Sequence, residues 1–241
     1  MGPADGSSTG ATLPRVTGGT GRFITIEGPD GSGKTTQVEA LAQRLRTAGV
    51  PVVVTREPGG TRLGEQLREI LLARHGGVEP TDALTDAFLF EAARRQLVRQ
   101  VIRPALADGM NVVCGRYSDS TFAYQGFGAG VSLDTLRVLD AAATDGLRPD
   151  LTILLDLPAE VGLARKGPDD TTRFEADHDV DFHRRVRAGF LALAGDEPHR
   201  FGVVDATRSV DEVAEDVRAL VDAVLARTAS EPEAPGVRIT R

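Results

Sequence analysis

The fold is decided by the stretch Gly28-Pro29-Asp30-Gly31-Ser32-Gly33-Lys34-Thr35, which matches the pattern G-x-x-x-x-G-K-[ST] at every fixed position. The apolar, β-branched run at residues 23–26 precedes it and predicts a strand. Residues 35–46 follow with the apolar spacing of a helix. In such a unit, backbone N–H groups of the loop surround nucleotide phosphates, and the helix N-terminus adds partial positive charge. The stretch therefore predicts a loop that binds a nucleoside triphosphate.

The polar side chains of this loop predict its chemistry. Lys34 would reach the β- and γ-phosphates, and the Thr35 hydroxyl would ligate Mg²⁺, the expected cofactor, together with ATP. The predicted ATP-binding residues are the loop and the residue after it: Gly28, Pro29, Asp30, Gly31, Ser32, Gly33, Lys34, Thr35 and Thr36. Asn111 is the only asparagine and Val112 follows it, so the guanine-reading motif Asn-Lys-x-Asp is missing. A small kinase is the phosphate-loop class that fits best.

Short apolar runs alternate with helical patterns along the rest of the chain. Four further runs predict strands, at residues 52–54, 111–114, 151–155 and 201–204. The clearest helical pattern lies between them, at residues 81–108. This alternation predicts an α/β fold, a doubly wound five-stranded parallel sheet flanked by helices. We expect one domain at residues 22–228, with a disordered tail at 1–21 and a flexible tail at 229–241.

Composition excludes several classes of function. The 241 residues are 41% hydrophobic and include one cysteine, so a disulfide scaffold is excluded. The formal net charge of −7 argues against binding of polymeric nucleic acid, which favours a basic surface. The sequence lacks an apolar run of membrane-spanning length and an apolar signal-peptide core. We therefore expect a soluble protein of the cytoplasm that makes no use of a membrane.

Arginines at the ends of predicted strands suggest a second phosphate site. Arg56 and Arg116 each follow a strand, and the carboxyl ends of parallel strands border the ligand crevice. Phe90 and Arg94 lie four residues apart on the long predicted helix and therefore share one face. A ring beside a guanidinium group suits a flat base with an acceptor nearby. The alternative interpretation is that Phe90 belongs to the core and Arg94 is solvated.

The chain resembles the thymidylate kinase family over about residues 22–225. The most specific match is Thr55-Arg56-Glu57-Pro58-Gly59-Gly60-Thr61. The other matches are the phosphate loop with Glu27 and Thr36, Phe90-Glu91-Ala92-Ala93-Arg94, Arg116-Tyr117 with Ser120 and Tyr124-Gln125, and Arg148-Pro149-Asp150 before Leu154-Leu155-Asp156. The resemblance implies transfer of the ATP γ-phosphoryl group to dTMP, giving dTDP for dTTP biosynthesis. It also implies a homodimer.

The resemblance further implies roles for individual residues. Phe90 would stack on thymine, and Arg94 would contact the base or the monophosphate. Tyr124 would lie under the deoxyribose, and Asp30 would contact the 3′-hydroxyl or the water shell of the metal. The implied substrate-binding residues are Arg56, Glu57, Phe90, Arg94, Arg116, Ser120, Tyr124 and Gln125.

Catalytic cations are also implied by the resemblance. Some members carry an arginine inside the phosphate loop, whereas bacterial members use arginines of a mobile lid; this loop has Gly31 and no arginine. The polar segment at residues 165–173 fits such a lid, with Arg173 as the first candidate and Arg165 as the second. A solvated loop is the alternative. The predicted catalytic residues are Lys34, Asp30, Arg116, Arg173 and Arg165.

One position departs from the family pattern. Gly115 precedes Arg116-Tyr117, where the family commonly has Asp-Arg-Tyr. Either Asp30, Glu57 or a rearranged water compensates for the missing carboxylate, or the enzyme is slow or specialised. Two other functions therefore stay open at this point. They are another nucleoside monophosphate kinase, acting on dUMP, CMP or GMP, and a catalytically weak nucleotide-binding protein.

Overall fold

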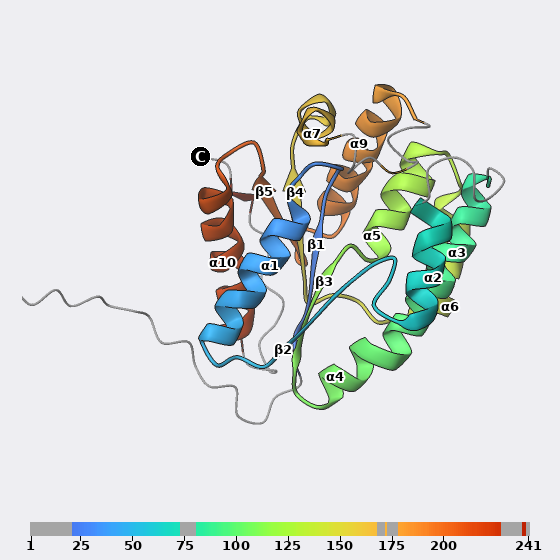
Figure 1. The fold of residues 1–241 in the computed structure, drawn as a ribbon. Helices are drawn as coiled ribbons and strands as arrows, with labels where there is room; N and C mark the ends of the chain where they lie inside the picture. The colour runs from blue at the N-terminus through green and yellow to red at the C-terminus, as the bar shows by residue number, and fades with distance from the viewer. Residues whose placement is uncertain (1–20, 73–80, 168–171, 173–177, 228–237, 240–241) are drawn as a thin grey trace, which may run out of the picture.

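A single parallel sheet with helices on both faces organises the protein (Figure 1). The computed structural model describes residues 21–72, 81–167, 172, 178–227 and 238–239. Its strands are β1 (Phe23–Glu27), β2 (Val52–Arg56), β3 (Asn111–Gly115), β4 (Leu151–Asp156), β5 (Phe201–Asp205) and β6 (Arg238–Ile239). Their order in the sheet is β2-β3-β1-β4-β5-β6.

The five predicted strands are confirmed, and all their pairings are parallel. The difference lies at one edge, where the two-residue strand β6 pairs with β5 and makes the sheet six-stranded. The sequence pattern missed β6 because two residues are too few to show a period. Residues 1–20 and most of 229–241 lie outside the described residues, so the two predicted tails stay a prediction.

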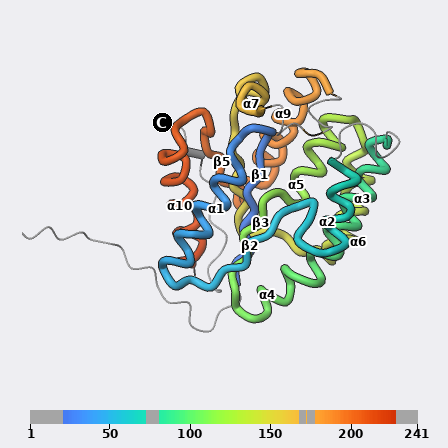
Figure 2. The backbone as a smooth tube through the Cα atoms, viewed as in Figure 1, coloured from blue at the N-terminus to red at the C-terminus, as the bar shows by residue number. Residues whose placement is uncertain are grey.

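Two helices cover one face of the sheet and lie side by side in both backbone views (Figures 1 and 2). They are α1 (Lys34–Thr47) and α10 (Val210–Ala226). Leu45 of α1 and Val221 of α10 are fully buried in one apolar cluster with Ile26 and Ile153 of the sheet. A capping box of Ser209 and Glu212 starts α10. Burial of this apolar layer holds α1, and with it the phosphate loop, against β1.

The remaining helices lie on the other face and around the carboxyl edge of the sheet (Figure 1). They are α2 (Arg62–Leu72), α3 (Ala83–Leu97), α4 (Arg103–Ala107), α5 (Ser118–Thr121), α6 (Leu133–Thr144), α7 (Ala159–Arg165) and α9 (Val180–Asp196), with π-helical segments η1 (Val98–Ile102) and η2 (Phe122–Gly128). None of the helices in the described ranges is both long and apolar enough to cross a bilayer.

The long helix predicted at residues 81–108 is confirmed as a continuous helical run, but its middle part is π-helical rather than α-helical. The π segment η1 joins α3 to α4. Pro104 lies one residue into α4 and has no N–H to donate to the preceding turn. The widened turn before it accommodates this loss, since π turns appear where the α ladder is interrupted.

The register of β1, β2 and β3 brings the ends of these strands together. Gly115, the last residue of β3, pairs with Ile26 of β1 on one side and with Arg56 of β2 on the other. The carboxyl ends of these three strands therefore lie at one edge of the sheet. The loops that leave them carry the phosphate loop, the Arg56 segment and Arg116, which is the arrangement expected for ligand binding in an open α/β sheet.

Candidate functional site

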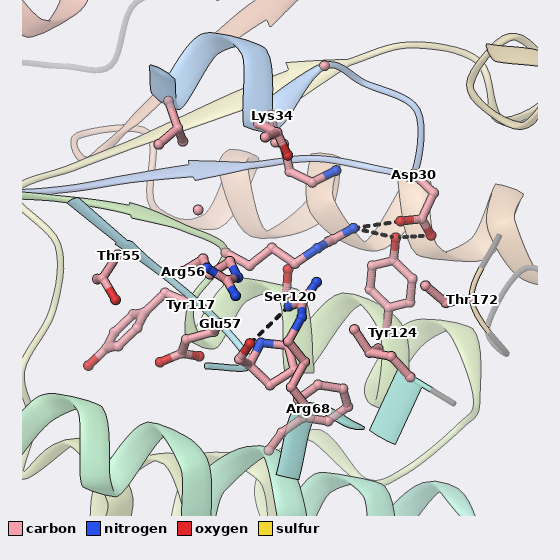
Figure 3. Close-up of a pocket in the computed structure, with 18 of the residues that line it drawn as sticks. Asp30, Lys34, Thr55, Arg56, Glu57, Arg68, Tyr117, Ser120, Tyr124 and Thr172 are labelled. Atoms are coloured by element: carbon pink, nitrogen blue, oxygen red, sulfur yellow. Dashed lines mark hydrogen bonds and ion pairs between the residues drawn. The ribbon is translucent and has the colours of Figure 1, made fainter. Parts of the chain in front are cut away.

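A cavity of about 740 Å³ opens at this edge of the sheet (Figure 3). Its walls come from the phosphate loop, the end of β2, helices α2 and α3, the segment from Gly115 to Gln125, and the end of α7. The sequence-predicted residues that line it are Asp30, Gly31, Gly33, Lys34, Thr35, Thr36, Arg56, Glu57, Phe90, Arg94, Arg116, Ser120, Tyr124, Gln125 and Arg165. Gly28, Pro29 and Ser32 belong to the same loop without lining the cavity, and Arg173 lies outside the described residues.

Lys34 is folded back onto its own loop. Its Nζ donates to the backbone oxygens of Gly28 at 3.0 Å and Pro29 at 2.7 Å, and to Ser32 Oγ at 3.2 Å. Burial and the neighbouring Arg116 lower the pKa of Lys34 to about 7. The ammonium group therefore lies in a site that disfavours positive charge until an anion arrives.

The top of the phosphate loop packs backbone against backbone on α7. A Cβ built on Gly31, which has φ of +72°, would lie 1.9 Å from the Gly162 oxygen. A Cβ on Gly162 would lie 2.2 Å from the Asp30 oxygen. Both positions therefore require glycine, and the loop has no room for a side chain at residue 31.

Asp30, Arg116 and Tyr124 form one cluster in the cavity. Asp30 accepts from Arg116 Nη2 at 2.7 Å and from the Tyr124 hydroxyl at 2.6 Å, and Figure 3 shows Tyr124 and Asp30 pointing toward one another. Burial alone would raise the pKa of Asp30, but Arg116 and Lys34 outweigh it and hold that pKa at about 2. Asp30 is therefore a carboxylate with both oxygens engaged.

Arg116 occupies a special backbone position. Its φ of 67° lies in the left-handed region, which a side chain other than glycine adopts only when its surroundings impose it. Besides Asp30, its guanidinium group donates to Ser120 Oγ at 3.0 Å and to the Gly28 oxygen at 3.3 Å. Arg116 thus links the phosphate loop to α5.

Glu27 holds this turn in place, and it is a residue whose role sequence reasoning missed. Its fully buried carboxylate accepts from Tyr117 N at 2.7 Å and from Ser120 Oγ at 2.6 Å. Burial, and next the charge of Asp119, raise the pKa of Glu27 to about 7. It lies at the end of β1 directly before the loop, so its contacts fix the start of α5 relative to the phosphate loop.

Three arginines, Arg56, Arg68 and Arg116, line the cavity, and the charges of Arg56 and Arg116 act on Arg68. Burial lowers the pKa of Arg68, and the positive charges of Arg56 and Arg116 lower it further. Arg68 Nη1 donates to the Pro58 oxygen at 2.9 Å, while Arg56 pairs with Glu65 at 3.0 Å. A cluster of arginines of this kind suits an anionic group. Sequence reasoning missed Arg68, because nothing in its spacing separates it from the other polar positions of α2.

Arg94 is buried and bonds to three neighbouring side chains. Only 1% of its side chain is exposed, so the interpretation of Arg94 as a solvated residue is wrong. Its Nε donates to Glu57 Oε2 at 2.9 Å, its Nη2 donates to Thr121 Oγ1 at 2.9 Å, and its Nη1 pairs with Glu91. Burial raises the pKa of both Glu57 and Glu91, and Arg94 opposes that rise. Glu57 Oε1 has no hydrogen-bond partner within the described part of the chain.

Less charged side chains also line the cavity. They are Phe90, half-buried on α3, Leu72 of α2, Tyr124 and the buried Gln125. An aromatic ring and an amide in a cationic pocket suit a planar base with hydrogen-bonding edges. The lining therefore makes the phosphate loop and the arginine cluster candidate anion sites, and Phe90 with Gln125 a candidate site for a base.

Comparison with known proteins identifies the family. A family model described as thymidylate kinase matches residues 26–217. The chain belongs to the thymidylate kinase family. A thymidylate kinase of Deinococcus radiodurans is 53% identical over 204 residues, which cover 83% of this chain and 96% of that protein. A thymidylate kinase of Thermomicrobium roseum is 52% identical over 211 residues, covering 87% and 99% of the two chains.

Solved structures agree with this family. A crystal structure of thymidylate kinase from Ehrlichia chaffeensis matches with a TM-score of 0.69 at 34% sequence identity. The match covers 84% of this chain and 99% of that chain. The predicted fold class, a phosphate-loop α/β kinase, is therefore confirmed, and so is the resemblance on which the functional interpretation rested.

Gly115, at the position where the family pattern leads us to expect a carboxylate, has free space around it. A Cβ built on Gly115 would lie 3.6 Å from Val38 Cγ2 and 3.8 Å from Arg56 Cβ, both ordinary van der Waals distances. The main chain at Gly115 also accepts a hydrogen bond from Glu57 N at 2.9 Å. An aspartate can therefore be introduced at this position without backbone conflict.

Arg165 of the predicted lid is turned away from the phosphate loop. Its Nη1 donates to the Ala206 oxygen at 2.8 Å and its Nη2 to the Thr207 oxygen at 3.4 Å, both just after β5. Its predicted role at the transferring phosphoryl group stays a prediction, as does that of Arg173. Most of the predicted lid lies outside the described residues.

Proposed function

We propose that this member of the thymidylate kinase family transfers the γ-phosphoryl group of MgATP to dTMP, giving dTDP and ADP. The observation that carries the proposal is a single cavity. Its lining includes a phosphate loop with Lys34, a second cluster of three arginines, and Phe90 and Gln125. A donor triphosphate and an acceptor monophosphate can therefore meet between two separate sets of cations.

The donor side follows from the phosphate loop. Backbone N–H groups of the loop and Lys34 would hold the β- and γ-phosphates, and the exposed Thr35 at the start of α1 would offer its hydroxyl to Mg²⁺. No group of three His, Cys, Asp or Glu residues suited to a metal lies in the described parts of the chain. This fits Mg²⁺, which is commonly held by substrate phosphates and water with few protein ligands. The ion supplies charge neutralisation on the phosphates.

The acceptor side follows from the arginine cluster. Arg56, Arg68 and Arg116 would bind the dTMP phosphate, Phe90 would stack on thymine, and Tyr124 would lie under the deoxyribose. Arg94 would contact the base or the monophosphate, with Ser120 and Gln125 near the deoxyribose. Glu57 would orient Arg94. Asp30 would contact the 3′-hydroxyl or the water shell of the metal.

The reaction needs positioning more than covalent chemistry. An oxygen of the dTMP phosphate attacks the γ-phosphorus while the bond from that phosphorus to the β–γ bridging oxygen breaks, and ADP leaves with the electron pair. In this proposal Lys34 would lie on the donor side of this path and Arg116 on the acceptor side. They would stabilise the charge that spreads over the transferring oxygens.

A panel of acceptors tests the proposal. ADP formation from MgATP is measured with dTMP, dUMP, CMP and GMP under identical conditions, and we expect dTMP to give the highest kcat/KM. A preference for CMP or GMP would contradict the assignment of the acceptor. A protein that binds MgATP but turns over none of the four would instead be a nucleotide-binding protein.

Substitution of Gly115 by aspartate is expected to raise kcat severalfold. The space beside Val38 and Arg56 accepts the side chain, and a carboxylate there would help to order the metal-bound water and the phosphate-binding arginines. Steady-state kinetics with dTMP measure the effect, with Gly115→Asn as the uncharged control of similar size. Unchanged or lower kcat in Gly115→Asp would show that the absence of a carboxylate at residue 115 does not limit turnover.

We also propose a homodimer in the cytoplasm. Exposed apolar side chains gather on α2 and α3 (Leu63, Ile70, Leu84 and Phe88) and on α6 (Val138), helices that contact one another in the order α2, α3, α6. A second copy of this chain would cover them. Sedimentation velocity measures the mass in solution, and a single-chain mass at micromolar concentration would contradict the dimer.

A further inference from the structure

A buried ion pair joins α5 to the start of β5. Arg200, the residue before β5, donates from Nη1 to Asp119 Oδ2 at 2.8 Å and from Nη2 to Asp119 Oδ1 at 2.7 Å. The side chains of Arg200 and Asp119 are 7% and 3% exposed. Two parallel bonds between a guanidinium group and a carboxylate fix orientation as well as distance. The pair therefore determines where α5 lies relative to the sheet.

Further bonds tie Arg200 to the sheet and to α9. Its Nη1 also donates to Thr152 Oγ1 of β4 at 2.7 Å. Its Nε donates at 2.9 Å to Oε2 of Glu197, the residue that follows α9, and Glu197 pairs in turn with the exposed Arg148. Arg200 is thus held by β4 and α9 independently of α5. It provides a fixed point to which α5 is attached.

The other residues of α5 connect this attachment to the cavity. Ser120 follows Asp119 in the helix, lines the cavity and accepts from Arg116 Nη1 at 3.0 Å. Arg116 has a left-handed φ of 67°, a conformation that persists only where the surroundings impose it. Its N–H donates to the Ile26 oxygen of β1 at 3.0 Å, so Arg116 is held between the sheet and α5. A movement of α5 would therefore move the guanidinium group of Arg116.

The charge of Asp119 also acts on Glu27. The fully buried Glu27 accepts from Tyr117 N and Ser120 Oγ, which fixes the start of α5. Burial, and next the charge of Asp119, raise the pKa of Glu27. Arg200 supplies the counter-charge of Asp119, and its loss would favour protonation of Glu27 further. Because a neutral carboxyl group is a weaker acceptor than a carboxylate, Arg200 supports α5 by this route as well.

We propose that Arg200 and Asp119 are positioning residues for the acceptor phosphate, which hold α5 from outside the cavity and thereby keep Arg116 turned toward that phosphate. The proposal rests on the proposed function, in which Arg116 binds the phosphate of dTMP. Arg200 and Asp119 themselves would not touch the substrate, since neither lines the cavity. Their substitution should therefore weaken recognition of the phosphate and leave recognition of the nucleoside intact.

A comparison of dTMP with thymidine measures this effect. Thymidine has the same base and sugar without the phosphate, so the ratio of the two Kd values isolates what the phosphate contributes. We expect Arg200→Met to weaken binding of dTMP roughly tenfold, as loss of the partner behind a ligating group does in metal sites. Binding of thymidine should stay within about twofold of the wild type, and the KM for dTMP should rise while the KM for MgATP does not. Isothermal titration calorimetry and steady-state kinetics provide the two readouts.

Two further variants keep the test decisive. Arg200→Lys retains the charge but cannot form both bonds to Asp119, so a smaller loss of the same kind is expected, and it replaces Arg200→Met if that variant does not fold. Arg148→Met is the matched control. It removes an exposed arginine from the other end of the same network and leaves the pair of Arg200 and Asp119 in place. It should bind both ligands as the wild type does.

A double-mutant cycle separates positioning from a merely structural role. Arg116→Met removes the group through which the pair is proposed to act. In that background, Arg200→Met should change the ratio of the Kd values for dTMP and thymidine by less than about twofold. An effect of full size in that background would overturn the proposal. Equal weakening of both ligands by Arg200→Met alone, or no change in either, would overturn it as well.

The failure of this proposal and that of the proposed function are distinguishable. If the wild type phosphorylates dTMP and the ratio of Kd values in Arg200→Met equals that of the wild type, only the role of Arg200 and Asp119 is lost. If the wild type prefers another monophosphate, the proposed function fails. The same comparison made with that monophosphate and its nucleoside then decides the role of the pair.

Discussion

Substitution of Arg94 by methionine is expected to lower the free energy of unfolding by about 3–5 kcal/mol, as removal of one partner from a buried ion pair does. Arg94 is 1% exposed, pairs with the buried Glu57 and Glu91, and donates to the Thr121 hydroxyl. Without it, two buried carboxyl groups must either bind protons or stay charged without a counter-ion. Methionine fills much of the volume, so the effect is electrostatic rather than a cavity. Urea denaturation of both proteins at neutral pH measures it.

The neighbouring arginine supplies the control. Arg95 lies on the same helix, but its partner Asp145 has a side chain that is 53% exposed, and Arg95→Met should change stability by less than about 1 kcal/mol. Combining Arg94→Met with Glu57→Gln should restore part of the loss, since one of the two stranded carboxyl groups disappears. A loss below about 1 kcal/mol in Arg94→Met would show that the buried Arg94 side chain is not a structural requirement.

Substitution of Lys34 by methionine is expected to lower kcat roughly 10³-fold, at the upper end of the effect of a single charge-stabilising donor. In the free protein, the Lys34 ammonium binds the Gly28 and Pro29 oxygens and Ser32 Oγ. Because these contacts are local, the variant should fold with nearly wild-type stability. Single-turnover kinetics with saturating MgATP and dTMP separate the chemical step from binding. A kcat within about tenfold of the wild type would remove Lys34 from the transfer step.

The lowered pKa of Lys34 also predicts a pH dependence of ATP binding. Its pKa of about 7 in the free protein, set by burial and by Arg116, means that the amine is mostly neutral above pH 8. Bound phosphates favour the ammonium form, so binding takes up a proton there. The Kd for MgATP should rise about tenfold per pH unit between roughly pH 7.5 and 9 in the wild type. Lys34→Met should show no such slope, and isothermal titration calorimetry of both proteins measures it.

The parts of the fold that could be predicted are the strands and helices whose residues show a short-range apolar pattern. Strands such as residues 23–26 and 151–155 are short apolar runs, and burial on both faces of a parallel sheet makes such runs recognisable. Strand β6 could not be predicted, because its two residues pair with β5 across a long stretch of chain. The π segment η1 was also missed, since the apolar spacing of residues 81–108 reports a helix without reporting its winding.

The site also contains residues that the sequence indicates and residues that only the fold reveals. The phosphate loop and Arg56 belong to contiguous motifs, so their spacing alone indicates phosphate binding. Arg68 and Glu27 reach the site only through the fold. Arg68 lies on α2, whose polar positions look alike in the sequence, and Glu27 lies at the buried end of β1. Burial decided one question about Arg94: helix spacing alone favoured a solvated residue over a ligand-site residue, and the structure shows a buried side chain.

The contact between Gly31 and Gly162 restricts how this enzyme can change by single substitutions. Any side chain at residue 31 would meet the main chain of α7, and any side chain at residue 162 would meet the main chain of the loop. A lineage with this pairing therefore cannot acquire a loop cation at residue 31 in one step, because each intermediate disrupts the nucleotide site.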